Sequence, residues 1–148
     1  MQKRPIILFL LSLCAAGESF AQTPWINEFH YDDSGGDSGE FVEIVVPSSF
    51  TDLASVTLTL YNGGDGRTYG AHMLSTFEAG SSSAGVTFYS KLISGIQNGA
   101  PDGMALTWPE GTQFISYEGS FVAANGPAAG LTSFDIGVAQ ADTGAPDG

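Results

Sequence analysis

Short runs of apolar, β-branched and aromatic residues alternate along the chain with connections that contain glycine or proline. Few stretches free of both reach the roughly ten to twelve residues that a helix needs, so the pattern predicts strands. In one of them apolar and polar positions alternate strictly, which places Val56, Leu58 and Leu60 on one face. The predicted strands cover residues 25–31, 41–46, 56–62, 68–74, 86–92, 104–108, 113–117 and 134–138.

Eight short strands at this spacing predict a single all-β domain, an antiparallel β-sandwich of immunoglobulin-like type. Residues 62–66 have the sequence Asn-Gly-Gly-Asp-Gly and predict a hairpin connection, because glycine adopts positive φ angles at little cost. One helical turn is expected near residues 51–54. The three serines at 81–83 are expected to form a loop within the domain, and no domain boundary is indicated.

Residues 119–130 are rich in alanine and glycine and include Phe121 and Asn125. The segment is either a contact surface for a partner or a connection packed against the domain. Of these two interpretations, the packed connection is favoured.

The first 21 residues have the pattern of a secretory signal peptide. Lys3 and Arg4 precede an apolar run over residues 6–17, and Ser19 and Ala21 supply small side chains for signal peptidase. The run is shorter than the roughly 18 residues of a membrane span. We expect cleavage near Ala21 and a secreted, extracellular or periplasmic domain over residues 22–148.

Lipid anchoring is the alternative for this end of the chain. Leu11-Ser12-Leu13-Cys14 resembles a lipoprotein acylation box at its first two positions. A small residue should precede the cysteine, however, and Leu13 stands there. Ordinary cleavage is therefore favoured.

Charge and cysteine content narrow the possible functions. The chain has 16 acidic and 4 basic residues and a net charge of −12 at pH 7, and only Arg67 and Lys91 are basic after Ala21. A domain this acidic repels the phosphate backbone of nucleic acids. We therefore do not expect direct nucleic-acid binding. The one cysteine, Cys14, leaves with the signal peptide, so the mature domain has no disulfide and no thiolate metal site.

The acidic loop over residues 32–40 is the candidate metal site. Its four carboxylates, Asp32, Asp33, Asp37 and Glu40, are interleaved with glycine and serine and offer the hard oxygen ligands that Ca²⁺ prefers. The spacing is not that of an EF-hand, and a solvated acidic loop is the favoured alternative. Asp65 is a further candidate ligand.

The sequence carries none of the common catalytic motifs. It has no Gly-x-Ser-x-Gly, no His-Glu-x-x-His and no phosphate-binding loop with a lysine. His30 and His72, the only histidines, are expected to be structural. Glu28 and Glu43 fall in neighbouring predicted strands and form a carboxylate pair of the kind that glycosidases use, but a framework role is favoured. We predict no enzymatic activity for the chain as given.

Several motifs taken together resemble the lamin tail domain of secreted bacterial proteins, from Trp25 to the end of the chain. They are Ile-Asn-Glu-Phe-His-Tyr at 26–31, Gly-Glu-Phe-Val-Glu-Ile at 39–44, Gly-Ile-Gln-Asn-Gly at 95–99, Pro-Asp-Gly at 101–103, Gln-Phe-Ile-Ser-Tyr-Glu-Gly at 113–119, Gly-Pro-Ala-Ala-Gly at 126–130 and Asp-Ile-Gly-Val at 135–138. The resemblance implies an immunoglobulin-like sandwich with no catalytic residues of its own.

Two functions follow from that resemblance and from the composition. The first is a secreted, non-catalytic module for binding, targeting or structure, which attaches a protein to an extracellular polymer, a surface or another protein domain. The alternative is the N-terminal accessory domain of a larger extracellular hydrolase, because lamin tail domains often lie beside nucleases of the endonuclease/exonuclease/phosphatase type.

The sequence Gly-Ala-Pro-Asp-Gly occurs at residues 99–103, where it leads into a predicted strand, and again at 144–148. The second copy leads into no predicted strand, and the lamin-tail resemblance implies one or two more. We therefore expect the sandwich over residues 22–148 to lack its last strand or strands.

Overall fold

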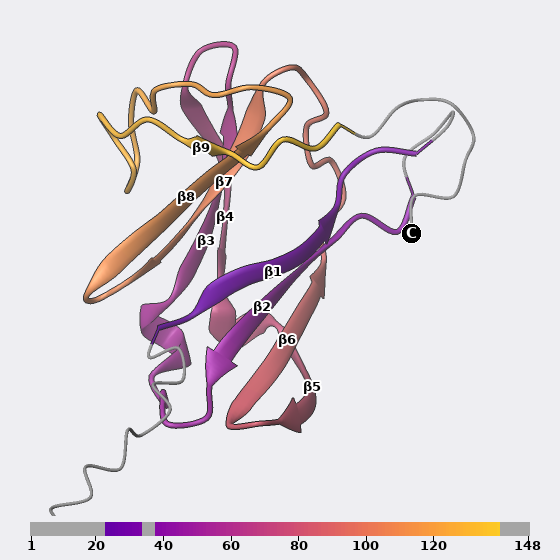
Figure 1. The fold of residues 1–148 in the computed structure, drawn as a ribbon, viewed down its shortest axis with the longest axis vertical. Helices are drawn as coiled ribbons and strands as arrows, with labels where there is room; N and C mark the ends of the chain where they lie inside the picture. The colour runs from indigo at the N-terminus through magenta and orange to yellow at the C-terminus, as the bar shows by residue number, and fades with distance from the viewer. Residues whose placement is uncertain (1–22, 34–37, 140–148) are drawn as a thin grey trace, which may run out of the picture.

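The computed structural model describes residues 23–33 and 38–139 (Figure 1). The predicted signal peptide, Asp37 and the second Gly-Ala-Pro-Asp-Gly sequence lie outside these residues. The elements of the described chain are β1 (Trp25–His30), β2 (Phe41–Pro47), η1 (Leu53–Ser55), β3 (Thr57–Asn62), β4 (Arg67–Met73), η2 (Leu74–Thr76), β5 (Glu78–Ser83), β6 (Val86–Leu92), β7 (Asp102–Trp108), β8 (Gly111–Tyr117) and β9 (Phe134–Asp135). None of the helices in the described chain has the length and apolar character to span a membrane.

Two β-sheets pack face to face. The first sheet has the strand order β1-β2-β6-β5, and the second sheet has the order β4-β3-β7-β8-β9. The fold is the expected all-β sandwich. Among the described strands, the one departure from antiparallel pairing is β9, which runs parallel to β8. The hairpin connection predicted at residues 62–66 joins β3 to β4.

Three local expectations need correction. Residues 81–83 belong to β5 and are not a loop; all six residues of β5 are exposed, so apolar alternation gave no signal there. The strand predicted over 68–74 ends at Met73, because Leu74–Thr76 form the 3₁₀ turn η2 between the sheets. The strand predicted over 134–138 is only two residues long. The helical turn expected near 51–54 is found at Leu53–Ser55.

The main core lies between the two sheets. As the alternation in β3 predicts, Val56, Leu58 and Leu60 are buried in it. The same core contains Val42 and Ile44 of β2 in the first sheet and Leu106 of β7 in the second sheet. Burying these side chains removes apolar surface from water and is the main source of stability, since the described residues contain no cysteine to form a disulfide.

A second, smaller core lies on the other side of the second sheet, where residues 119–130 fold over it. The small core contains Tyr61, Ala105, Phe114, Phe121, Ala123 and Ala128. The backbone N–H of Ala124 donates to the carbonyl of Gly66, which ties the covering segment to the β3–β4 hairpin. The interpretation of residues 119–130 as a packed connection is confirmed.

The hydroxyl group of Tyr61 on β3 forms two hydrogen bonds with the backbone of this covering segment. It donates to the carbonyl oxygen of Asn125 at 3.1 Å and accepts from the backbone N–H of Ala128 at 3.0 Å. We expect Tyr61→Phe to lower the free energy of unfolding by about 1–3 kcal/mol, because it leaves buried backbone groups without partners. Urea melts give the change. Tyr89→Phe is the control, since that hydroxyl has no hydrogen bond within the described chain; an equal loss there contradicts the prediction.

Candidate binding groove on the outer face of the first sheet

The outer face of the first sheet carries a line of polar side chains that crosses all four strands. Glu28 on β1 pairs in register with Glu43 on β2, Glu43 pairs with Ser90 on β6, and Ser90 pairs with Glu78 on β5. Residues paired in this way project from the same face, and directly opposite neighbours have Cβ atoms roughly 5 Å apart. The register thus gathers three carboxylates and one hydroxyl into a single row, called the acidic row below.

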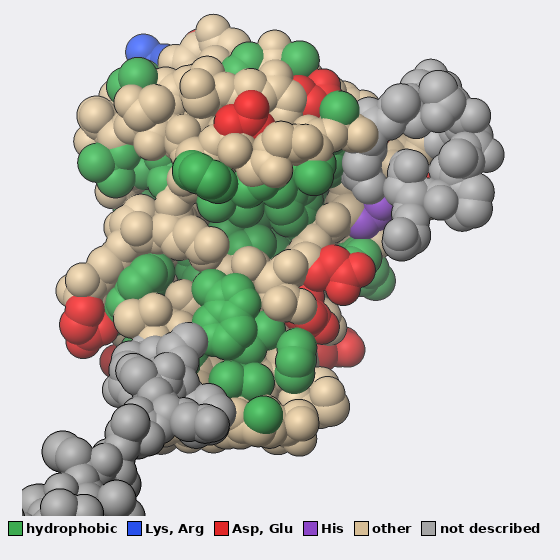
Figure 2. Space-filling model, viewed as in Figure 1, with side chains coloured by type: hydrophobic (Ala, Val, Ile, Leu, Met, Phe, Trp, Pro, Cys, Tyr) green, Lys and Arg blue, Asp and Glu red, His purple; other side chains and the backbone are tan. Residues whose placement is uncertain are grey.

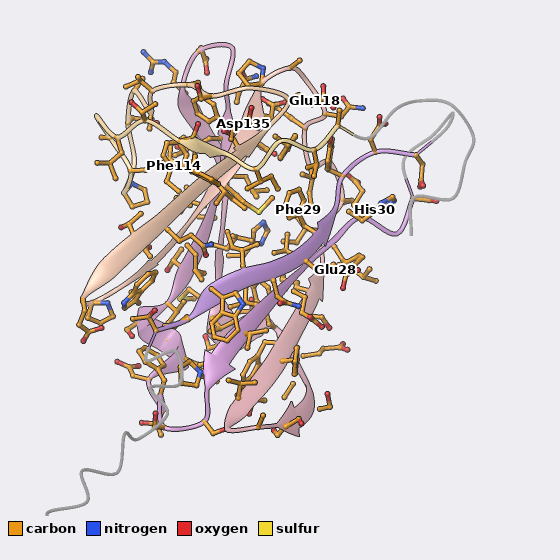
Figure 3. All side chains as sticks on the ribbon, in the orientation of Figure 1. Glu28, Phe29, His30, Phe114, Glu118 and Asp135 are labelled. Atoms are coloured by element: carbon orange, nitrogen blue, oxygen red, sulfur yellow. The ribbon has the colours of Figure 1, made fainter. Side chains whose placement is uncertain are left out.

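A β-bulge in β1 puts Glu28 into this row. Ile26 pairs with Ile44 and Glu28 with Glu43, so two residues of β1 span one step of β2. The extra residue, Asn27, shifts the alternation: Ile26 is buried in the core, Glu28 is exposed and Phe29 packs against the core again. Without the bulge, Glu28 would face the core. Glu28, Phe29 and His30 follow one another along the end of β1 (Figure 3).

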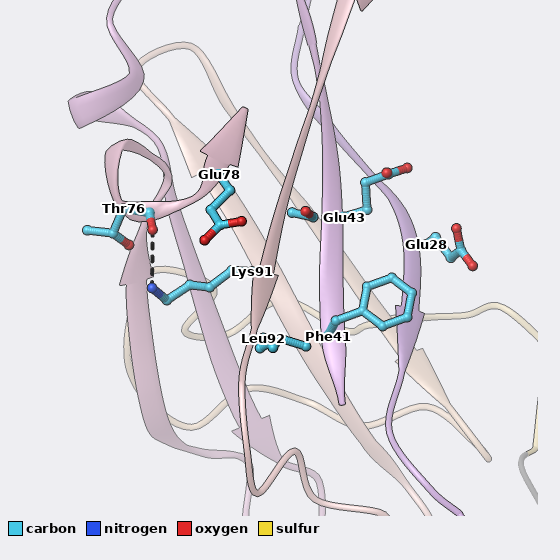
Figure 4. Close-up of a pocket in the computed structure, with 8 residues that line it drawn as sticks. Glu28, Phe41, Glu43, Thr76, Glu78, Lys91 and Leu92 are labelled. Carbon is cyan, nitrogen blue, oxygen red and sulfur yellow. Dashed lines mark hydrogen bonds between the residues drawn. The ribbon is translucent and has the colours of Figure 1, made fainter. Parts of the chain in front are cut away.

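The acidic row lies in a hollow of about 550 Å³ (Figure 4). Its lining residues are Glu28, Phe41, Glu43, Thr76, Glu78, Ser90, Lys91 and Leu92. Phe41 and Leu92 pair in register beside the row, and the Leu92 side chain is 76% exposed. The groove therefore combines negative charge with a small apolar surface.

The one basic side chain of the groove is turned away from the acidic row. The Lys91 ammonium donates to the carbonyl oxygen of Thr76 at 3.2 Å (Figure 4). It also lies 5.9 Å from the centre of the Phe77 ring. Glu43 accepts from the side-chain amide of Asn27 at 2.8 Å. Within the described chain, the only ion pair joins His30 to Asp33, so none neutralises the row.

Like charges directly opposite each other in a β-sheet are destabilising, so the Glu28–Glu43 pair has a local cost. A cationic group placed over the row removes that repulsion. The aliphatic stem of a lysine or arginine also finds Phe41 and Leu92 within the same groove, and the aromatic face of Phe41 attracts cations. The arrangement suits a ligand that carries positive charge on an apolar stem.

Sequence reasoning found half of the acidic row. The prediction that Glu28 and Glu43 lie on neighbouring strands is confirmed by their register. Sequence reasoning missed Glu78, because residues 78–83 were not recognised as a strand. It predicted the strand that contains Ser90 but assigned that residue no role. An exposed strand of small polar residues has no apolar period, so only the pairing of β5 with β6 reveals the position of Glu78.

The residues of the predicted acidic-loop metal site have separate contacts. Asp33 accepts from the backbone N–H and hydroxyl of Ser38 at 3.0 and 3.1 Å. Asp32 accepts from the side chain of Asn98 at 3.0 Å, and Glu40 is buried and accepts from the backbone N–H of Gly95 at 2.6 Å. Among the described residues, no three His, Cys, Asp or Glu side chains form a metal-binding group; Asp37 is not described. Calcium binding by the loop stays a prediction.

Asp65 accepts from the backbone N–H of Arg67 at 2.9 Å, within its own hairpin. This contact assigns it a local role in the turn.

The two histidines differ in their surroundings. His30 Nε2 lies 3.1 Å from Asp33 Oδ1. The hydrogen bond from the Ser38 backbone N–H lowers the pKa of Asp33, and the charge of His30 adds to the effect. Burial lowers the pKa of His72 on β4, and the positive charge of Lys91 lowers it further. His72 is therefore poorly suited to be a charged group at neutral pH.

Comparisons with protein-family models, with curated proteins and with solved structures found no match to this chain.

Proposed function

We propose that this chain is a secreted, non-catalytic binding module of the lamin-tail type, and that its groove binds a positively charged, extended segment of a partner protein. The observation that carries the proposal is the acidic row, whose three carboxylates, Glu28, Glu43 and Glu78, lie in a hollow beside the exposed Leu92.

The two outer faces of the sandwich differ in a way that supports this choice. Residues 119–130 cover part of the second sheet and bury Tyr61 and Phe114 on its outer side. On the first sheet, Glu28 and Glu78 are exposed and Glu43 is half-buried. Acidic side chains also outnumber basic ones on the face drawn in Figure 2. A positively charged partner is therefore attracted over long range before it docks.

The edge of the first sheet favours an extended partner. β5 pairs with β6 on one side only, and its side chains are small apart from Glu78. An exposed strand edge of this kind offers backbone N–H and C=O groups to an added strand. A segment that pairs along β5 passes Glu78 at the end of the acidic row, where a lysine or arginine side chain can reach into the groove.

The proposal predicts binding of a synthetic peptide that alternates lysine with leucine. We expect Glu43→Gln/Glu78→Gln to weaken that binding by about tenfold, because two charge-assisted contacts are lost. Isothermal titration calorimetry at low and at physiological salt measures the change, and affinity should fall as salt screens the charges.

The matched control is Asp52→Asn/Glu110→Gln, two exposed residues outside the groove whose replacement changes the net charge equally. We expect less than about a twofold effect from it. Equal weakening in both variants means that only overall charge attracts the peptide, and it contradicts the groove. An acidic peptide of equal length should not bind.

A further inference from the structure

Two buried side-chain oxygen atoms near the acidic loop have no hydrogen-bond donor among the residues that the structure describes. They are Glu40 Oε1 and Gln97 Oε1. The Glu40 side chain is only 5% exposed, yet it carries a carboxylate whose second oxygen alone is satisfied, by the backbone N–H of Gly95. Leaving a buried charged acceptor unmatched is costly, so such an atom points to an additional group that contacts it.

The segment that contains Gln97 also contacts Glu40. Residues 93–98 contact Asp32 and Glu40, at the two ends of the acidic loop, three times: the Ile93 N–H donates to the Glu40 carbonyl, Gly95 donates to the Glu40 carboxylate, and Asn98 donates to Asp32. Gln97 stands between the last two contacts. Its backbone is fixed from both sides, since its N–H donates to Tyr69 and its carbonyl accepts from Tyr117.

This end of the sandwich is also rich in negative charge. Glu118 accepts from the Tyr31 hydroxyl at 3.0 Å, and Figure 3 places Glu118 toward the same end of the molecule as His30. Burial raises the pKa of Tyr69 to about 12, and the negative charges of Asp102 and Glu40 contribute to the rise. None of these three carboxylates forms an ion pair with a basic side chain in the described part of the chain.

We propose that a calcium ion binds where residues 93–98 cross the base of the acidic loop, with Glu40 Oε1 and Gln97 Oε1 as its side-chain ligands. Backbone carbonyls and water complete the coordination. A calcium ion supplies positive charge as well as partners for the two oxygens, whereas a water molecule supplies partners only.

The ligand chemistry favours calcium over other common metals. The two oxygens are hard ligands, one charged and one neutral, and calcium accepts such mixtures in flexible geometry. Zinc prefers nitrogen and sulfur, and magnesium holds most of its water. With one carboxylate ligand, the site resembles extracellular calcium modules in strength, which bind at roughly 0.1–1 mM.

Thermal unfolding of the purified chain, in chelator and then in about 5 mM CaCl₂, tests the site. At this concentration we expect the midpoint to rise by about 3–6 °C, because calcium held only by the folded state stabilises it. The rise should disappear in Glu40→Gln and in Gln97→Met. The second variant leaves the contacts of the Gln97 backbone in place, since both hydrogen bonds of Gln97 within the described chain use backbone atoms. MgCl₂ at equal concentration should give less than half of the rise.

Asp33→Asn is the discriminating control, because Asp33 belongs to the acidic loop and its contacts are to Ser38 and His30. The proposed site predicts that this variant keeps most of the calcium shift. Loss of the shift in Asp33→Asn places the ion in the loop and overturns the proposal. Persistence of the calcium shift in Gln97→Met also overturns the proposal. A wild-type chain with no calcium shift overturns it as well, and then water satisfies the two oxygens.

Discussion

Replacing Phe121 by alanine is expected to lower the free energy of unfolding by about 3–4 kcal/mol, the cost of removing a large ring from a core. Phe121 is the only large side chain that the covering segment 119–130 contributes to the small core. Its ring meets Phe114 edge-on at 5.3 Å and lies 6.4 Å from the Tyr61 ring. No other residue of the segment can fill the resulting cavity, because the neighbours Ala123 and Ala128 are small.

The backbone of β7 at Gly103 packs closely against the Phe121 ring. A Cβ atom built on Gly103 would lie 3.1 Å from Phe121 Cε1 and 2.4 Å from the Ile115 carbonyl oxygen, so only glycine fits at this point of β7. The sheet cannot therefore move easily to close the cavity.

The adjacent Val122→Ala is the matched control, because the Val122 side chain is 56% exposed. We expect it to cost less than about 1 kcal/mol. Urea melts of both variants measure the difference. If Phe121→Ala costs no more than Val122→Ala, residues 119–130 do not pack on the second sheet in solution, and the outer face of that sheet is open.

The fold could be predicted from the sequence where strands have a buried face. The alternation of Val56, Leu58 and Leu60 found β3, and the glycine-rich 62–66 connection found its hairpin, since both signals are local. β5 has no buried residue and its existence depends on pairing with β6, which is a long-range property. The small core could not be predicted from the sequence for a related reason. It includes Phe121, Ala123 and Ala128, which lie in irregular chain where apolar residues have no fixed period.

The candidate groove, too, could be predicted from the sequence only in part. Glu28 and Glu43 were placed on neighbouring strands because each adjoins a recognisable apolar run. The two side chains face outward together only because of the bulge at Asn27. A bulge depends on packing on both sides of a strand, which a sequence alone does not show. Glu40 was placed in the acidic loop with three aspartates by sequence proximity. Instead, its side chain is buried, because Glu40 directly precedes β2 and its carboxylate turns toward Gly95.

Replacing Asp102 by alanine is expected to lower the free energy of unfolding by about 3 kcal/mol. Asp102 is 3% exposed, and its carboxylate accepts from the backbone N–H of Gly63 at 2.8 Å and of Gly99 at 2.7 Å. It thus joins the β3–β4 hairpin to the segment before β7. Gly63 has no room to adjust, since a Cβ there would lie 2.0 Å from the Pro101 carbonyl oxygen. Alanine leaves both N–H groups without an acceptor.

The control is Asp65→Ala, which removes a single hydrogen bond from an exposed residue of the same hairpin. We expect a cost below about 1 kcal/mol in urea melts. Equal costs for the two variants mean that water reaches the N–H groups of Gly63 and Gly99, and that Asp102 does not hold the two segments together.

The pH dependence gives an independent test of the same carboxylate. Burial raises the pKa of Asp102 above its ordinary value of 3.8, although the hydrogen bonds from Gly63 and Gly99 oppose the rise. Between 3.8 and the raised pKa the folded chain holds more protons than the unfolded chain, so this group's contribution to stability falls as the pH rises through that window. Most paired carboxylates act in the opposite direction. Urea melts of the wild type and Asp102→Asn between pH 3.5 and 7 isolate the effect, because asparagine does not titrate. We expect the stability of the wild type to fall relative to the variant as the pH rises. A relative increase means that the two N–H groups outweigh burial and hold the pKa of Asp102 below 3.8.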